Sequence, residues 1–121
     1  MAHETVRINQ NLTVVFVSRE LESGTRETVN RLRDLCRREI DQGHDVIIDF
    51  ASTNICPSIV WGNIIVQAKK AATSGRQIAI CCLRPTLDKS VRIIGMTKYV
   101  HVYPSRNDAL EAMTGGTENA S

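Results

Sequence analysis

One serine stands where a protein could carry a phosphate. Ser58 follows Pro57, at the end of a polar loop that leaves the β-branched run Val46-Ile47-Ile48. The residues after Pro57 predict a helix, so Ser58 lies in its first turn. Unpaired backbone N–H groups and the positive end of the helix dipole favour an anion there. Helix capping by the hydroxyl is the simpler role, and the residues alone leave both roles open.

The sequence contains no recognisable catalytic motif. The segment Cys56-Pro57-Ser58-Ile59 lacks the second Cys or Ser that a thioredoxin-type site carries three residues after its first cysteine. No cysteine is followed by the arginine of a Cys-x5-Arg phosphate loop, and no glycine-rich nucleotide motif is present. Asp49 has no neighbouring His or carboxylate, so it is best interpreted as a loop cap. We expect no catalytic residues; a small enzyme using a cysteine or Asp49 remains the alternative.

Metal ligands are not predicted either. The four cysteines show no CxxC pairing, and the three histidines have no recognisable ligand spacing. Cys81 and Cys82 are adjacent in an expected strand, so we expect their side chains to point to opposite faces. Reduced, mostly buried thiols are the expectation, with no metal and no cofactor.

Composition restricts the class of protein. The chain has 121 residues, 42% of them hydrophobic, which fits one globular domain. Aromatic residues make up only 4% and the net charge is +2, so nucleic-acid binding is not expected. No apolar run approaches the ~20 residues that span a membrane. The segment Met1-Ala2-His3-Glu4 does not begin a signal peptide, and we expect a cytoplasmic protein without membrane insertion.

Hydrophobic periodicity predicts an α/β domain with a mixed sheet, parallel core strands and about four helices. The runs 46–48 and 78–83 are nearly continuously apolar, as in parallel strands buried on both faces, and the helix between them implies a right-handed crossover. The domain is expected to span residues 1–114, followed by a flexible polar tail, 115–121. The predicted elements are two short strands around 6–8 and 12–16, a helix ended by Gly43, strand 46–48, helix 57–74, strand 78–83, a short helix ended by Gly95, strand 99–103 and a helix capped by Ser105.

Two apolar residues of helix 57–74 do not follow its main apolar face. Ile59 and Val66 are seven residues apart and fall nearly opposite the face formed by Trp61, Ile64 and Ala68. Either another helix covers them or they are exposed for a partner. Coverage by another helix is the simpler expectation.

Three segments, in this order and at these separations, resemble the STAS domain, the fold of anti-sigma factor antagonists. Val46-Ile47-Ile48-Asp49-Phe50 is similar to the family's strand ending in Asp-Leu. The segment from Leu87 to Met96 resembles its short helix and terminal turn, and Ser105 to Leu110 resembles its closing segment. The β-β-α-β-α-β-α-β-α order of the predicted elements resembles the family too, and the resemblance covers about residues 5–113.

The resemblance also implies a function for the serine. In that family the loop after the third strand ends in Asp-Ser-[ST]-Gly, and a partner that is both kinase and anti-sigma factor phosphorylates the serine. Ser58 falls on the acceptor position. Its flanks differ from the family pattern: Pro57 replaces the acidic residue, and Ile59-Val60 replaces the small pair.

The leading hypothesis is therefore a regulatory module that binds an anti-sigma factor or serine kinase-type protein and is switched by phosphorylation. The alternative is a non-phosphorylated STAS subunit of a larger scaffold or transporter complex, and self-association is left open. ATP would sit on the partner, so no cofactor is expected here. The predicted partner-binding residues are Ser52, Thr53, Asn54, Pro57, Ser58, Ile59, Gly62 and Val66, with Ser58 as the phosphorylation site.

Overall fold

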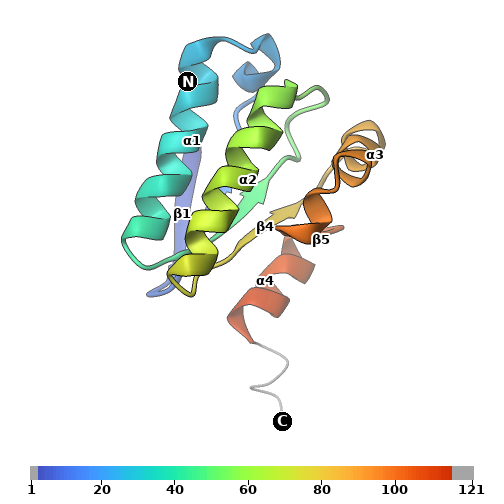
Figure 1. The fold of residues 1–121 in the computed structure, drawn as a ribbon. Coiled ribbons are helices and arrows are strands. Elements are labelled where there is room, and N and C mark those ends of the chain that lie inside the picture. The colour runs from blue at the N-terminus through green and yellow to red at the C-terminus, as the bar shows by residue number, and fades with distance from the viewer. Residues whose placement is uncertain (1–2, 116–121) are drawn as a thin grey trace.

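The computed structural model describes residues 3–115 and shows the predicted order of elements (Figure 1). Two short 3-10 helices are added to that order. The elements are β1 (Glu4–Asn9), β2 (Leu12–Phe16), η1 (Arg19–Ser23), α1 (Arg26–Asp41), β3 (Asp45–Asp49), α2 (Ser58–Thr73), β4 (Ile78–Cys81), α3 (Pro85–Ile94), η2 (Met96–Lys98), β5 (His101–Tyr103) and α4 (Arg106–Thr114).

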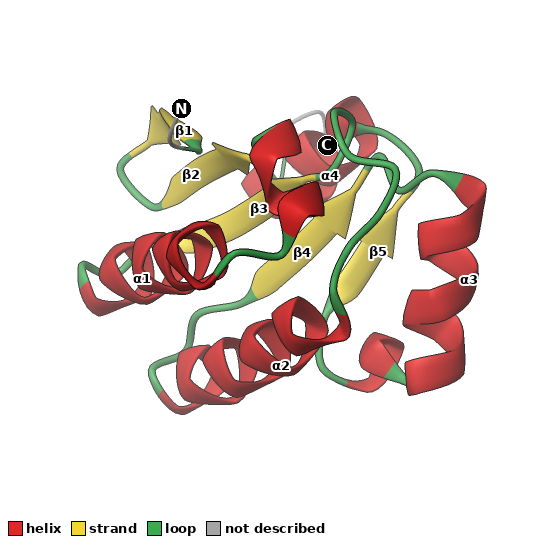
Figure 2. Cartoon of the chain, turned by 90° about the horizontal axis from the view of Figure 1, so that it is seen from above, coloured by secondary structure: helices red, strands yellow, loops and turns green. Residues whose placement is uncertain are grey.

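The strands form one mixed sheet in the order β1-β2-β3-β4-β5. β1 pairs with β2 in antiparallel fashion, and the three remaining pairings are parallel. Helices α1 and α2 lie on one face of the sheet, α4 lies on the other, and α3 lies beyond β5 (Figure 2). The predicted fold class is thus confirmed. The parallel pairing also places the carboxyl ends of β2, β3 and β4 at the same edge.

The central strands are buried on both faces, as their apolar runs predicted. In β3, Val46 and Ile48 pack with α1 and α2, whereas Ile47 belongs to the smaller cluster under α4. In β4, Ile78 and Ile80 face the first cluster and Ala79 faces the second. Alternation along each strand therefore builds two apolar layers.

Helix ends follow the predicted stop and start signals. Gly43 and Gly95 both adopt the left-handed conformation that ends a helix, with φ of 89° and 84°. The Ser105 side chain accepts a hydrogen bond from the Asp108 backbone N–H at 3.1 Å, as the capping box predicted. Gly115 caps α4. The rest of the predicted tail, 116–121, lies outside the described residues.

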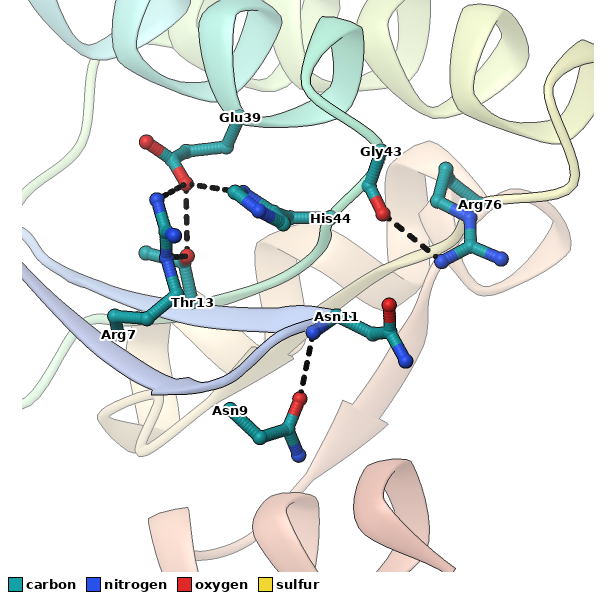
Figure 3. A network of polar contacts seen from close by, with 8 residues as sticks. All are labelled: Arg7, Asn9, Asn11, Thr13, Glu39, Gly43, His44 and Arg76. Atoms are coloured by element: carbon teal, nitrogen blue, oxygen red, sulfur yellow. Dashed lines mark hydrogen bonds and ion pairs between the residues drawn. The ribbon is translucent and has the colours of Figure 1, made fainter.

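A polar network holds the end of the sheet where the parallel strands begin (Figure 3). The Glu39 carboxylate accepts hydrogen bonds from the Thr13 hydroxyl at 2.7 Å and from His44 Nδ1 at 2.8 Å. Arg7 lies 3.5 Å from the same oxygen. Glu39, Thr13 and His44 are all buried, so these contacts replace the water that the carboxylate loses.

The network should make stability depend on pH. Burial alone would raise the pKa of Glu39, but hydrogen bonds from Thr13 and His44 and the nearby charges of His44 and Arg7 outweigh it and lower that pKa. A lowered pKa means that the ionised form stabilises the fold above the ordinary value, about pH 4.3, and that this contribution is lost as pH falls further.

We expect Glu39→Gln to lower the free energy of unfolding by about 1–3 kcal/mol at pH 7, because a charged acceptor is lost from a buried network. The difference from wild type should shrink below about pH 4, where the wild-type carboxylate is itself protonated. Urea unfolding at several pH values measures it. Glu27→Gln, which breaks an exposed pair with Arg31, is the control and should change little. A difference that stays constant down to pH 3 would contradict the assignment.

Candidate functional site

The loop of residues 50–57, between β3 and α2, starts at the edge where three parallel strands end. The Val17 N–H donates to the Asp49 carbonyl at 3.0 Å, and the Phe50 N–H donates to the Cys81 carbonyl at 3.1 Å. These bonds join the ends of β2, β3 and β4. We refer to residues 50–57 as the β3–α2 loop.

Asp49 holds the start of this loop. Its side chain is only 1% exposed. One carboxylate oxygen accepts the Ala51 N–H at 2.8 Å, and the other accepts Arg106 Nη1 at 3.0 Å. The loop-capping interpretation of Asp49 is therefore confirmed. Arg106, the first residue of α4, was missed because its place in the sequence is remote from the loop.

The inner side of the loop is closed by Phe50 and Thr53. The Thr53 N–H and hydroxyl both donate to the Phe50 carbonyl at 3.1 Å, and Thr53 has no exposed surface. The Phe50 ring packs against Trp61 of α2, with 5.2 Å between ring centroids. Thr53, one of the predicted contact residues, is thus an internal anchor whose side chain contributes nothing to the outer face of the loop.

Residues outside the predicted site support the loop from both sides. The Asn54 N–H donates to the Glu22 carboxylate at 2.6 Å, and Arg84 Nη2 donates to the Ala51 carbonyl at 3.1 Å. An open hollow of about 580 Å³ beside the loop is lined in part by Ser52, Asn54 and Arg84. Arg84 follows β4 directly, so parallel topology could have identified it. No comparable sequence feature identified Glu22 as a residue that supports the loop.

Ser58 is the first residue of α2 and is exposed. Pro57 occupies the N-cap position, and no side chain caps the helix. The capping role that the residues favoured for Ser58 is therefore wrong. No acidic residue lies in the first turn of α2, so the helix start keeps its positive partial charge. The predicted site at the helix entrance offers a hydroxyl to solvent.

Aliphatic side chains are exposed around Ser58. Ile59 is 60% exposed and Val66 is 48% exposed, and Gly62 is exposed between them. The expectation that another helix covers Ile59 and Val66 is wrong for the described residues 3–115. Ile55 in the loop is 62% exposed. It was missed, although an isoleucine inside a polar loop was a readable signal. We refer to Ile55, Ile59, Gly62 and Val66 as the aliphatic patch.

The cysteines near the loop differ from expectation in one respect. Burial raises the pKa of the half-buried Cys56 thiol to about 12, so nothing activates it as a nucleophile. β4 ends at Cys81, and Cys82 has a φ of 64° instead of an extended conformation. The two sulfur atoms consequently lie 3.6 Å apart. The prediction that they point to opposite faces is wrong, because it assumed that the strand continued.

The chain folds as an α/β domain. Its β3–α2 loop and the first turn of α2 lie at the edge of the sheet where the parallel strands end. The family model of the STAS domain matches residues 4–109. The chain belongs to the STAS domain family. None of the curated protein sequences compared with the chain matches it. No helix between residues 3 and 115 is long and apolar enough to cross a membrane.

Solved structures with low sequence identity share this fold. A STAS domain protein from Planctomyces limnophilus is 14% identical, with a TM-score of 0.79 over 94% of this chain and 99% of that one. The anti-sigma factor antagonist SpoIIAA in its unphosphorylated form is 14% identical, with a TM-score of 0.76 over 94% and 97%. The Bacillus cell fate determinant SpoIIAA in its phosphorylated form is 16% identical, with a TM-score of 0.71 over 93% and 99%.

The anchoring role of Thr53 can be measured directly. Thr53→Val keeps the shape of the side chain but removes its hydrogen bond to Phe50, so the free energy of unfolding should fall by about 1 kcal/mol. Ser52→Ala, at an exposed neighbour in the same loop, is the matched control and should stay within about 0.5 kcal/mol of wild type. Chemical unfolding gives both values. Equal stability of the two variants would show that the hydroxyl contributes nothing.

Proposed function

We propose that this chain is a regulatory module of the anti-sigma factor antagonist type. Its β3–α2 loop and the aliphatic patch bind a protein partner, an anti-sigma factor or serine kinase-type regulator, in the cytoplasm. The observation that carries the proposal is the exposure of Ile55, Ile59 and Val66 beside an uncapped helix start that presents Ser58. The unphosphorylated and phosphorylated forms of SpoIIAA, which share the fold, support it.

The contact surface combines polar and apolar groups. Ser52, Asn54 and Ser58 supply the polar rim, and Pro57 with the aliphatic patch supplies the apolar area that a partner would remove from water. Thr53 holds the loop from inside. Burial of an aliphatic side chain contributes about 1.5–3 kcal/mol, part of which offsets the cost of association, so the polar contacts must add to the affinity.

Phosphorylation of Ser58 would switch this contact. The partner kinase, which holds ATP, transfers the terminal phosphoryl group to the Ser58 hydroxyl oxygen: the bond between the terminal phosphorus and the bridging oxygen breaks, ADP leaves, and the hydroxyl proton passes to a base on the kinase. The new group carries about −1.5 to −2 charges. The first turn of α2 tolerates that charge in the free domain, since its backbone N–H groups favour an anion. Burial of the same charge against an aliphatic interface is costly, and a loss of about 2–3 kcal/mol reduces affinity more than tenfold.

Incubation with the serine kinase-type anti-sigma factor of the same genome and ATP should add one phosphate. Intact-mass spectrometry detects it, and the gain should disappear in Ser58→Ala while it persists in the control Ser52→Ala. If the wild type binds the kinase but is not modified, the proposal that phosphorylation controls binding is wrong, whereas the proposed binding surface is not contradicted. Modification of Ser58→Ala to the wild-type extent would place the acceptor elsewhere.

The aliphatic patch should dominate partner affinity. Ile59→Ala should weaken binding about tenfold or more, because roughly 1.5–3 kcal/mol of apolar burial is lost. Ile93→Ala is a matched control, since Ile93 is 75% exposed on α3 and lies outside the patch. Both variants should unfold like wild type, because neither side chain is in the core. Calorimetric titration with the partner measures the affinities; equal losses in both variants would argue against this surface.

A scaffold subunit is the second candidate, and the exposed patch is the observation that favours it. Ile59 and Val60 stand where the family has a small pair, and the Ile59 side chain adds exposed apolar area that a permanent neighbour would cover. A scaffold subunit should elute as a stable higher assembly, alone or with a fixed partner. Size-exclusion chromatography with light scattering distinguishes it from a monomer that binds reversibly.

A further inference from the structure

Two thiols and a carboxylate meet beneath the β3–α2 loop. Cys81 ends β4, Cys82 follows in the left-handed conformation, and Asp49 ends the neighbouring strand β3. One ligand atom from each residue lies within 4.8 Å of the other two. The parallel register pairs Asp49 with Cys81 directly, so the cluster is a consequence of the sheet rather than of a flexible surface.

The separation of the sulfur atoms matches a metal-bound pair. A tetrahedral zinc ion binds thiolates at about 2.3 Å, which places two of them about 3.8 Å apart. Here the Cys82 thiol donates a hydrogen bond to the Cys81 sulfur, and the two sulfur atoms are 3.6 Å apart. A disulfide needs about 2.0 Å and a specific dihedral angle, so it would require a larger rearrangement of this turn.

We infer that Cys81, Cys82 and Asp49 bind a thiophilic divalent cation of the zinc type. The two cysteines supply the thiolates, Asp49 supplies a carboxylate oxygen, and the fourth position stays open to water or a partner's ligand. Two thiolates and a carboxylate offset the charge of the ion in this buried place. The ion enters from the side of Cys82, which is half-buried, because Cys81 has no exposed surface.

The site is coupled to the candidate contact surface. An ion on Asp49 would compete with Arg106, whose guanidinium lies 3.0 Å from the carboxylate. Arg106 begins α4, and Asp49 also accepts the Ala51 N–H. The Cys81 carbonyl accepts the Phe50 N–H. Metal binding therefore acts on the groups that position the start of the β3–α2 loop.

Titration of the reduced protein with Cd²⁺ tests the inference. We expect thiolate-to-cadmium charge-transfer absorbance that saturates at one equivalent and is reversed by a large excess of Zn²⁺. Cys82→Ser should weaken binding at least tenfold. Cys56→Ser removes a half-buried thiol outside the cluster and should bind like wild type. Absence of a one-equivalent transition, or equal affinity in Cys82→Ser and wild type, would overturn the inference.

A second measurement needs no variant. Zn²⁺ should slow alkylation of Cys82 by iodoacetamide, read by peptide mapping, while alkylation of Cys56 should be unchanged because both thiols are half-buried and only one belongs to the cluster. Equal rates at Cys82 with and without Zn²⁺ would contradict the site. Slower alkylation at both cysteines would show a general effect of the ion on the fold and would also count against it.

Discussion

The buried carboxylate of Asp49 is the interaction on which the candidate site depends. It sits at the end of β3, between the ends of β2 and β4, and it has exchanged water for the Ala51 N–H and the Arg106 guanidinium. A buried carboxylate is tolerated only with such partners, since its desolvation is costly. Asp49 thereby fixes the direction in which the chain leaves the sheet and ties it to the start of α4.

The outer face of the loop follows from this inner anchoring. Phe50 and Thr53 turn inward, which leaves Ser52, Asn54 and Ile55 outside. Pro57 then enters α2 with no N–H to satisfy, and Ser58 and Ile59 follow in the exposed first turn. A hydroxyl, a helix N-terminus and aliphatic area are thus adjacent. This combination suits reversible binding controlled by a charge, which is the function we propose.

The sequence predicted the fold closely because its strongest signals were local. Continuous apolar strands, periodic helices and glycine stops such as Gly43 and Gly95 each specify one element, and the order of elements then indicated the family. The family resemblance then placed the candidate site at Ser58, which stays a prediction. The contacts that the sequence did not predict join segments far apart in the chain. Arg106 donates a hydrogen bond to Asp49, and the Asn54 N–H donates one to Glu22; only the folded chain brings the members of each pair together.

Two errors have simple physical causes. Ile59 and Val66 were expected under another helix, because large aliphatic side chains are more often buried than exposed, yet both are exposed. Cys81 and Cys82 were expected on opposite faces, because strand alternation was extended one residue too far. Cys82 lies beyond the end of the strand and has a positive φ, and no local sequence pattern predicted this conformation. Both departures adjoin the β3–α2 loop: Ile59 and Val66 are in the helix that follows it, and the Cys81 carbonyl accepts the Phe50 N–H.

Hydrogen exchange of the domain with and without its anti-sigma or kinase partner tests the central claim most directly. Amides of residues 51–66 should be protected in the complex, because the β3–α2 loop and the first turns of α2 would be covered. Amides of α3 around Ile93 should exchange as in the free domain. Protection confined to α3 or to the β1 edge, with residues 51–66 unchanged, would contradict the account.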